Sequence, residues 1–346
     1  MINKLSNRKK VLIAGIGGAS LGTEILKCLQ LADKYEIYGC DISLSAYGLY
    51  EPGFAATRLV TQENYIDDVL RFCDEKKIKW IIPGGEQPNT LLNAASEIFS
   101  AHNITVVTND RATVELFSDK DAAFKKLDIL GVPIPKTQEL KSVADLVDIG
   151  LPCIVKPAVG SGGSVSVFFA VTSEEALIYA DYIRRNGSTP IAQEYINNDD
   201  GEFTIGVLSL PNGELVGSVA LRRALDAKLS VAYKGRGGLI SSGYSQGRID
   251  IYSELCEQAE KIAVAIKSRG PINVQGRVRD GILLPFEINP RFSASTYLRA
   301  LAGFNEIDIF LDYLSDGKVP KPASIKSGWY LRSLTENYIA DDRIQK

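Results

Sequence analysis

The sequence predicts an α/β domain with a parallel sheet, followed by an α+β region of longer strands. Over the first 110 residues, short apolar runs alternate with helical patterns. That alternation is typical of a parallel sheet covered on both faces. After about residue 196 the expected strands lengthen and the helices are segregated from them. With 346 residues, of which 45% are hydrophobic, the chain is long enough for two or three domains with substantial cores.

In the first part, strands are expected at residues 11–16, 36–40, 58–60, 80–82 and 104–107, and helices at 21–31, 65–76 and 90–99. A further helix is expected over 120–130, because Gly131 and the following prolines end it.

In the second part, strands at 153–155 and 165–169 flank a glycine loop, and a helix over 173–186 has Ser173 as its candidate N-cap. Strands follow at 192–195, 204–209, 215–221, 273–278 and 283–288, with a helix over 252–268. From about Lys318 the pattern weakens, which predicts a partly ordered tail.

Charge and histidine content exclude several classes of function. The 39 basic and 42 acidic residues give a net charge of −3, which provides no electrostatic footprint for nucleic acid. The only histidine is His102, expected in a polar turn with a structural role. Sites built on a histidine base, and His-rich zinc sites, are therefore excluded. Catalysis has to rely on carboxylates, lysine, arginine, amides or a bound cofactor.

Cysteine usage and the N-terminus bear on the compartment. The five cysteines form no CxxC pair, and the odd count favours reduced thiols in a cytoplasmic protein. Basic residues precede the apolar run at 11–14, as in a signal peptide, but glycines interrupt the run, which favours a strand and a turn. No stretch approaches 18 apolar residues, so no membrane span is expected.

A glycine-rich turn, Gly15-Ile16-Gly17-Gly18-Ala19-Ser20-Leu21-Gly22, follows the first expected strand, and Asp41 ends the next one. The arrangement is similar to a dinucleotide-binding fingerprint, in which glycines admit a pyrophosphate and an acid binds ribose. The third glycine of that pattern would fall at Ser20, so a tight turn without nicotinamide is favoured. An NAD-dependent dehydrogenase is the alternative.

A lysine beside a second glycine loop suggests phosphate binding. Lys156 ends an expected strand, and the loop from Gly160 to Ser164 follows. Loop N–H groups can donate to phosphate oxygens while the ammonium offsets their charge. A plain glycine hairpin with a surface lysine is an equally good interpretation. The segment 193–196, followed by Glu202, offers backbone groups to an adenine edge and a carboxylate to ribose, although a solvated edge strand explains it as well.

The most specific motif joins Asn273-Val274-Gln275 to Phe286-Glu287-Ile288-Asn289-Pro290-Arg291. Residues two apart on a strand share a face, so Glu287, Asn289 and Arg291 can point together. A carboxylate and an amide oxygen suit Mg²⁺, and an arginine suits a phosphoryl group. A solvent-facing strand is the alternative.

The turn between these strands decides whether Gln275 joins Glu287. A two-residue turn at 280–281 pairs 279 with 282 and places the two side chains on opposite faces, whereas a three-residue loop at 279–281 places them together. We expect the three-residue loop, with Gly281 in the left-handed position of a G1 bulge.

Taken in this order, the motifs resemble the ATP-grasp superfamily, and in particular a single ATP-grasp unit of the carbamoyl phosphate synthase large subunit. The resemblance covers about residues 10–310. It implies a Rossmann-like, parallel-sheet pre-ATP-grasp domain at 1–118, followed by a two-lobed ATP-grasp fold. The small lobe with its glycine-rich lid would span 119–196, the large lobe with the Mg-ATP site 197–317, and a C-terminal tail 318–346.

The resemblance also implies a role for each matching residue. Lys120 and Lys156 would contact phosphates, and Arg291 would stabilise the transferred phosphoryl group, with Lys156 and Arg291 catalytic. The remaining positions follow: the lid Gly160, Ser161, Gly162, Gly163 and Ser164; the adenine hinge Glu194, Tyr195 and Ile196; the ribose contact Glu202; and Gln275, Glu287 and Asn289 as ligands of Mg²⁺ or Mn²⁺.

The implied reaction is ATP-dependent activation of a carboxylate as an acyl phosphate, followed by attack of an amine-type nucleophile and release of ADP and phosphate. Such chemistry needs positioning and charge neutralisation more than a protein base. The expected partners are a small-molecule carboxylate and an amine-type substrate, with a homodimer left open and no nucleic acid or membrane. Because the chain has one such unit and no evident glutaminase triad, synthesis of carbamoyl phosphate by this chain alone is not expected. A non-catalytic ATP-binding module is a further alternative.

Overall fold

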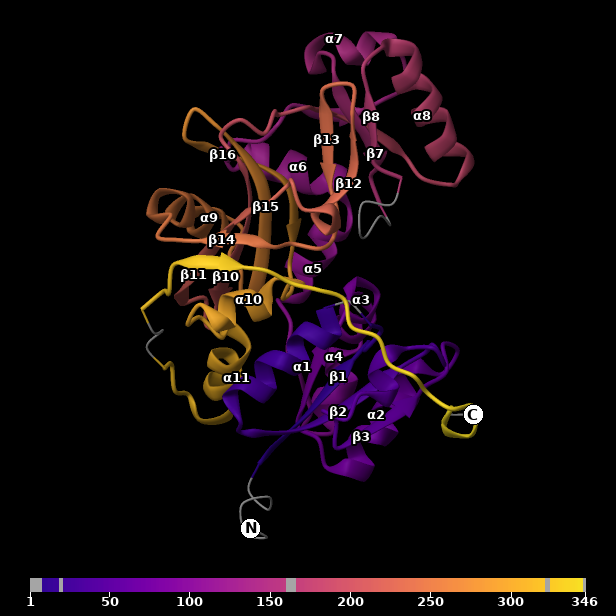
Figure 1. Cartoon of the computed structure of the whole chain (residues 1–346), viewed down its shortest axis with the longest axis vertical. Helices are drawn as coiled ribbons and strands as arrows, with labels where there is room; N and C mark the ends of the chain where they lie inside the picture. The colour runs from indigo at the N-terminus through magenta and orange to yellow at the C-terminus, as the bar shows by residue number, and fades with distance from the viewer. Residues whose placement is uncertain (1–7, 19–20, 160–165, 321–323, 345–346) are drawn as a thin grey trace.

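The computed structural model describes residues 8–18, 21–159, 166–320 and 324–344 (Figure 1). The N-terminal part is a five-stranded parallel sheet in the order β3-β2-β1-β4-β5, which confirms the predicted α/β domain. Its elements are β1 (Lys9–Ala14), α1 (Leu21–Ala32), β2 (Tyr35–Asp41), η2 (Tyr47–Tyr50), β3 (Ala56–Leu59), α2 (Tyr65–Lys76), β4 (Trp80–Pro83), α3 (Glu86–Ala94), α4 (Ser96–Ala101) and β5 (Thr105–Val106).

The central strand β1 explains why this sheet is covered on both sides. Val11 and Ile13 enter a core with α1, whereas Leu12 and Ala14 enter a second core with α2 and α4. Alternate strand residues therefore pack on opposite faces, as expected for a buried parallel sheet. The single helix expected at 90–99 is instead two helices, α3 and α4, which are separated at Ala95.

A four-stranded antiparallel sheet, β6-β9-β7-β8, forms the upper part of Figure 1. The N-cap of its helix α8 is Thr172 and not Ser173, since the Thr172 hydroxyl accepts a hydrogen bond from the N–H of Glu175. The elements of this region are α5 (Arg111–Ser118), α6 (Lys120–Ile129), β6 (Thr137–Glu139), η3 (Val143–Asp145), α7 (Leu146–Ile149), β7 (Cys153–Pro157), β8 (Phe168–Ala170), α8 (Ser173–Arg185) and β9 (Pro190–Glu194).

The remaining chain builds a six-stranded antiparallel sheet in the order β16-β15-β10-β11-β14-β17 and a separate hairpin, β12-β13. Residues expected as a tail contribute the edge strand β17. The elements are β10 (Glu202–Ser209), β11 (Leu215–Arg223), η4 (Lys228–Ser230), β12 (Val231–Gly235), β13 (Gly238–Ser241), β14 (Gly247–Ile249), α9 (Ser253–Ala265), β15 (Pro271–Arg279), β16 (Ile282–Asn289), α10 (Thr296–Leu301), α11 (Glu306–Asp316), β17 (Gly328–Tyr330) and η5 (Asp341–Arg343).

Helices α10 and α11 connect the large sheet to the N-terminal domain. Leu208 of β10 and Val219 of β11 share one buried cluster with Val11 of β1, and Phe304 and Phe310 complete it. The other face of the large sheet packs against α9 and α6. The N-terminal domain and the large sheet are thus joined by a continuous apolar core. Among the described helices, none has the length and hydropathy needed to cross a bilayer.

Candidate functional site

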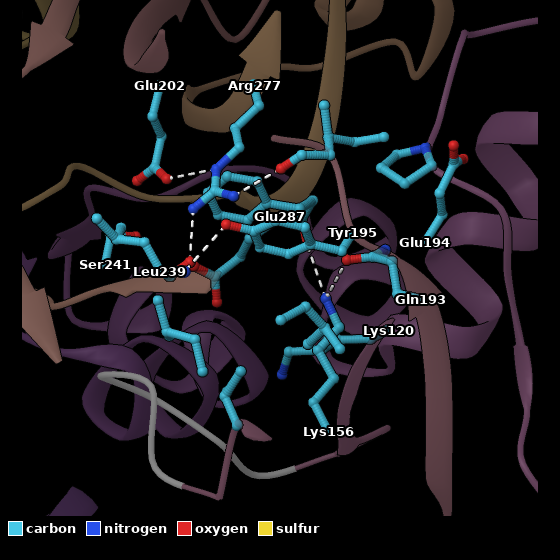
Figure 2. A pocket seen from close by; sticks show the side chains of 16 residues that line it. Lys120, Lys156, Gln193, Glu194, Tyr195, Glu202, Leu239, Ser241, Arg277 and Glu287 are labelled. Carbon is cyan, nitrogen blue, oxygen red and sulfur yellow. Dashed lines mark hydrogen bonds and ion pairs between the residues drawn. The ribbon is translucent and has the colours of Figure 1, made fainter. Parts of the chain in front are cut away.

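A pocket lies where the four-stranded sheet, the β12-β13 hairpin and the large sheet meet (Figure 2). A second, smaller hollow adjoins it, and the two share Lys120 and Glu287. The first pocket is lined by these residues that the sequence singled out: Lys120, Lys156, Glu194, Tyr195, Ile196, Glu202 and Glu287. Asn289 lines the second hollow. The proposed lid residues Gly160, Ser161, Gly162, Gly163 and Ser164 lie outside the described residues.

Lys156 is a buried cation at the floor of the pocket. Lys156 lies on strand β7 and is 5% exposed to solvent. Its Nζ donates to Gln193 Oε1 and to the carbonyl oxygen of Phe286, both at 2.9 Å (Figure 2). Burial and the neighbouring Lys120 lower its pKa to about 7, against a smaller opposing effect of Glu287. Within the described part of the chain, neither lysine forms a salt bridge. Two neighbouring lysines without a salt-bridge partner in that part of the chain suit an anion, which would favour the protonated form of Lys156.

The β15-β16 turn differs from the expected one. Arg279 pairs with Ile282, so the turn has two residues, Asp280 and Gly281, both with positive φ (53° and 75°). The predicted three-residue loop is therefore wrong, because Asp-Gly adopts the mirror-image turn that matches the strand twist.

A bulge in β16 places Gln275 and Glu287 on the same face of the sheet, as predicted. Gly276 pairs with Pro285 but Gln275 pairs with Glu287, which leaves Phe286 as an extra residue. Proline cannot donate to the ladder and is common at such irregularities. Gln275 Nε2 consequently donates to Glu287 Oε2 at 2.9 Å, so the two side chains share a face as predicted.

Glu287, Gln275 and Asn289 form an oxygen-rich group beside Arg291. Arg291 Nη2 donates to Asn289 Oδ1 at 3.2 Å, and its Nη1 donates to the carbonyl of Phe292 at 3.0 Å. No group of three or more His, Cys, Asp or Glu suited to a metal occurs among the described residues. One carboxylate with amide oxygens matches the sparse protein coordination typical of Mg²⁺ that is also bound by phosphates.

The Glu202 side chain is more deeply buried than we would expect for a carboxylate that contacts ribose from a solvated strand. Its carboxylate lies 2.9 Å from Arg277 Nε and 3.4 Å from Arg223 Nη1, and its side chain is fully buried. Its Oε1 accepts no hydrogen bond within the described residues. Arg223, the last residue of β11, points inward and donates to backbone carbonyls, including that of Ser242.

Arg277 is the residue that sequence reasoning missed. Its Nη1 donates to the carbonyl of Ile196 at 2.6 Å and its Nη2 to that of Leu239 at 2.7 Å, while its guanidinium lies 4.9 Å from the Tyr195 ring (Figure 2). It therefore ties the predicted hinge and strand β13 to the large sheet. The sequence could have indicated Arg277, because it lies two residues after Gln275 on the same strand and so shares its face.

The hinge segment is also fixed by side chains. Glu194 forms a 2.6 Å ion pair with Arg279 and accepts a hydrogen bond from the N–H of Lys136. The Tyr195 hydroxyl accepts a hydrogen bond from the N–H of Leu239 at 2.9 Å. The segment thus adjoins the pocket with its backbone already positioned.

The first glycine turn has a packing explanation. Asp41 accepts hydrogen bonds from the N–H groups of Ile16 and Ser43, so its carboxylate serves the turn itself. A Cβ at Gly22 or Gly84 would lie 2.0 Å or 1.9 Å from the carbonyl oxygen of Gly15. Glycine is needed at both positions because the backbone of Gly15 passes so close to them. Nothing in this geometry favours binding of a nicotinamide nucleotide.

Comparison with known proteins bears on the family and the fold of the chain. Residues 189–337 match the family described as ATP-grasp in the biosynthetic pathway with Ter operon. This part of the chain is thus similar to ATP-grasp domains. The carbamoyl phosphate synthase large chain of Neisseria meningitidis serogroup B is 23% identical to it over 311 residues, covering 83% of this chain and 27% of that protein. That of Clostridium botulinum is 22% identical over 331 residues, covering 91% and 30%. The chain thus spans less than a third of these relatives.

Solved structures show the same ATP-grasp fold. A biotin carboxylase–β,γ-ATP complex from Campylobacter jejuni matches with a TM-score of 0.69 and 20% identity, covering 92% of this chain and 73% of that one. D-alanine–D-alanine ligase from Bacillus anthracis, complexed with ATP, matches with a TM-score of 0.60 and 16% identity, covering 89% and 97%. The predicted resemblance and the two-lobed fold are confirmed, and the fold is that of ATP-grasp ligases.

Proposed function

We propose that this chain is an ATP-dependent ligase that activates a carboxylate as an acyl phosphate and joins it to an amine. The observation that carries the proposal is the pairing, in one pocket, of two unneutralised lysines with an acidic group. Lys120 and Lys156 line the pocket together with Glu287, which accepts a hydrogen bond from Gln275. A polyphosphate with a divalent cation would satisfy both the lysines and the carboxylate.

The nucleotide would occupy the pocket of Figure 2. Its adenine edge would meet the backbone of 194–196, and its phosphates would extend toward Lys156 and Lys120. Glu202 would reach the ribose only through the oxygen that accepts no hydrogen bond within the described residues. Exclusion of water from the phosphates, the role predicted from the sequence for residues 160–164, would protect an acyl phosphate from hydrolysis.

Glu287, Asn289 and Gln275 would hold Mg²⁺ or Mn²⁺, together with phosphate oxygens. The oxygen donor set fits that ion, and the low number of carboxylates fits a site completed by the substrate. When bound, the cation neutralises charge that develops on the transferred phosphoryl group.

In the first step, a carboxylate oxygen of the substrate would attack the γ-phosphorus of ATP, and the bond to the ADP oxygen breaks. Arg291, which Asn289 and the Phe292 carbonyl orient, would stabilise the transferred phosphoryl group. In the second step, the amine nitrogen attacks the acyl carbon and the bond to the phosphate oxygen breaks. The ammonium substrate releases two protons in all, of which one remains on phosphate at neutral pH.

The chain spans 27% of the curated relative in Neisseria, so synthesis of carbamoyl phosphate by this chain alone is not proposed. The substrates belong to the class of small carboxylates and amines. A homodimer stays a prediction.

Trapping with hydroxylamine tests the proposal without knowledge of the natural amine. Hydroxylamine converts an acyl phosphate to a hydroxamate, which forms a coloured complex with added iron(III). A panel of carboxylates with MgATP should therefore give hydroxamate and ADP in equal amounts. Lys156→Met should abolish both products because it removes a phosphate-binding cation. Absence of hydroxamate with every carboxylate, despite MgATP binding, would exclude the ligase activity.

A further inference from the structure

A further cavity, which shares no lining residue with the nucleotide pocket, lies against helix α1. Its volume is about 380 Å³, which falls within the range of small-molecule sites. The walls come from three parts of the chain: α1 and η2 of the N-terminal domain, the loop between β13 and β14, and the C-terminal segment 332–336. Figure 1 shows that segment crossing from β17 to the N-terminal domain.

Arg332 links this cavity to the loop that carries Arg291. Its Nη2 lies 2.5 Å from the carbonyl oxygen of Ala294, and the same nitrogen lies 3.3 Å from Glu24 of α1. Ala294 is three residues after Arg291, a span of at most about 11 Å between Cα atoms. The Arg332 side chain on the cavity wall is therefore held by the loop that also carries Arg291.

The charges on the cavity wall are unbalanced. Glu24 is neutralised by Lys27 at 2.9 Å and Arg332 at 3.3 Å. Glu51 and Glu336 also line the cavity, but no cation among the described residues forms a salt bridge with either. The wall thus carries three carboxylates against two cations. A cationic ligand would restore the balance.

The glycine turn also takes part in this cavity. Gly18 forms part of the wall, and a Cβ at that position would lie 2.7 Å from the Cβ of Tyr47. A side chain there would displace Tyr47, another wall residue. The absence of a side chain at Gly18 therefore preserves both the turn and the shape of the cavity wall.

We propose that this cavity binds the amine substrate in its ammonium form, with Glu51 and Glu336 as the recognising carboxylates. The inference rests on the proposed ligase function and assigns its second substrate to a place in the fold. Carboxylates also accept the proton that an ammonium loses before its nitrogen attacks, and the site has no histidine for that task.

The test compares the full-length protein with a Glu51→Gln/Glu336→Gln variant. The probes are ethanolamine, putrescine and the standard L-amino acids, added with MgADP and followed by thermal shift. We expect at least one amine to stabilise the unaltered protein, and its half-saturating concentration to rise at least tenfold in the variant. The variant should keep its affinity for MgATP, because neither glutamate lines the nucleotide pocket. Glu63→Gln is the matched control, an exposed glutamate that does not line the cavity, and should behave as the unaltered protein.

Hydroxylamine trapping separates the two proposals. Hydroxylamine is uncharged at neutral pH, so the double variant should still form acyl hydroxamate at the rate of the unaltered protein. If both proteins form hydroxamate and the double substitution leaves amine binding unchanged, the amine site alone is overturned. The amine site is overturned equally if no amine stabilises the unaltered protein. Loss of hydroxamate in both proteins would instead overturn the ligase function.

Discussion

The Nζ atom of Lys156 lies 2.9 Å from the carbonyl oxygen of Phe286, the extra residue of the bulge in β16. One irregularity in the strand therefore has two effects. It provides an acceptor for a buried ammonium, and it shifts the register so that Gln275 meets Glu287. The phosphate-binding side and the metal-binding side of the proposed site are built on the same backbone feature.

Binding of MgATP should become weaker as the pH rises above 7. Lys156 has its pKa lowered to about 7 by burial and by Lys120, and bound phosphates would raise it again. Above pH 7 binding must therefore take up a proton, and the Kd should rise by up to tenfold per pH unit. Calorimetry in two buffers of different ionisation enthalpy measures the uptake. Lys156→Arg, which stays charged, should remove the dependence; an equal slope in that variant would contradict the assignment.

The free protein should show the opposite trend in stability. Lys156 has a pKa near 7 when folded and an ordinary value of 10.5 when unfolded, so the unfolded chain binds more protons between these values. The contribution of this residue to the free energy of unfolding therefore increases from pH 7 toward pH 10. Urea unfolding of the protein and of Lys156→Met, compared at pH 7 and pH 9, isolates it. A difference between the two proteins that does not change with pH would argue against the lowered pKa.

Glu287→Ala should lower turnover by at least about 100-fold, the usual scale for loss of one group that stabilises a transition state. The protein should stay folded, because the Glu287 side chain contacts Gln275 at the edge of the pocket and does not fill the core. Rates of ADP release over a range of Mg²⁺ concentrations provide the measurement, with circular dichroism as the check on folding. Unchanged turnover would remove Glu287 from the metal site.

Arg277→Met should destabilise the protein by about 3–5 kcal/mol, because it leaves the buried Glu202 short of a counterion. It also releases the carbonyls of Ile196 and Leu239. The double variant with Glu202→Gln should recover part of the loss, since the uncompensated charge is then gone. Urea unfolding of the three variants tests this. Additive losses in the double variant would show that the two residues act independently.

Nucleotide selectivity separates the proposed ligase from a dehydrogenase. MgATP at 100 times its Kd should stabilise the protein by about 2.7 kcal/mol, whereas NADH should have no effect. The Asp41 carboxylate is engaged by Ile16 and Ser43, which leaves the glycine turn without the expected ribose acid. Thermal shift with both nucleotides decides the point; stabilisation by NADH alone would favour the dehydrogenase.

Local pattern was sufficient for much of the fold and for part of the site. The apolar run of β1, and Gly131 with the prolines after α6, predicted those elements to within two residues, because both signals depend on neighbouring residues. Short strands such as β6 and β14 were missed, since three residues carry too little periodicity. The predicted length of the β15-β16 turn was wrong, yet Gln275 and Glu287 still share a face because of the bulge at Phe286.

By itself, the sequence determined the chemistry available to this protein: one histidine, a lysine beside a glycine loop, and a Glu-x-Asn-x-Arg strand. Those residue types and spacings depend only on the chain. Only the tertiary structure decided that Arg277 neutralises Glu202, that Arg223 points inward, and that the C-terminal segment lines a cavity with α1. These relationships join residues up to about three hundred positions apart. Whether a buried charge is neutralised depends on the groups that the fold places around it, and not on its neighbours in sequence.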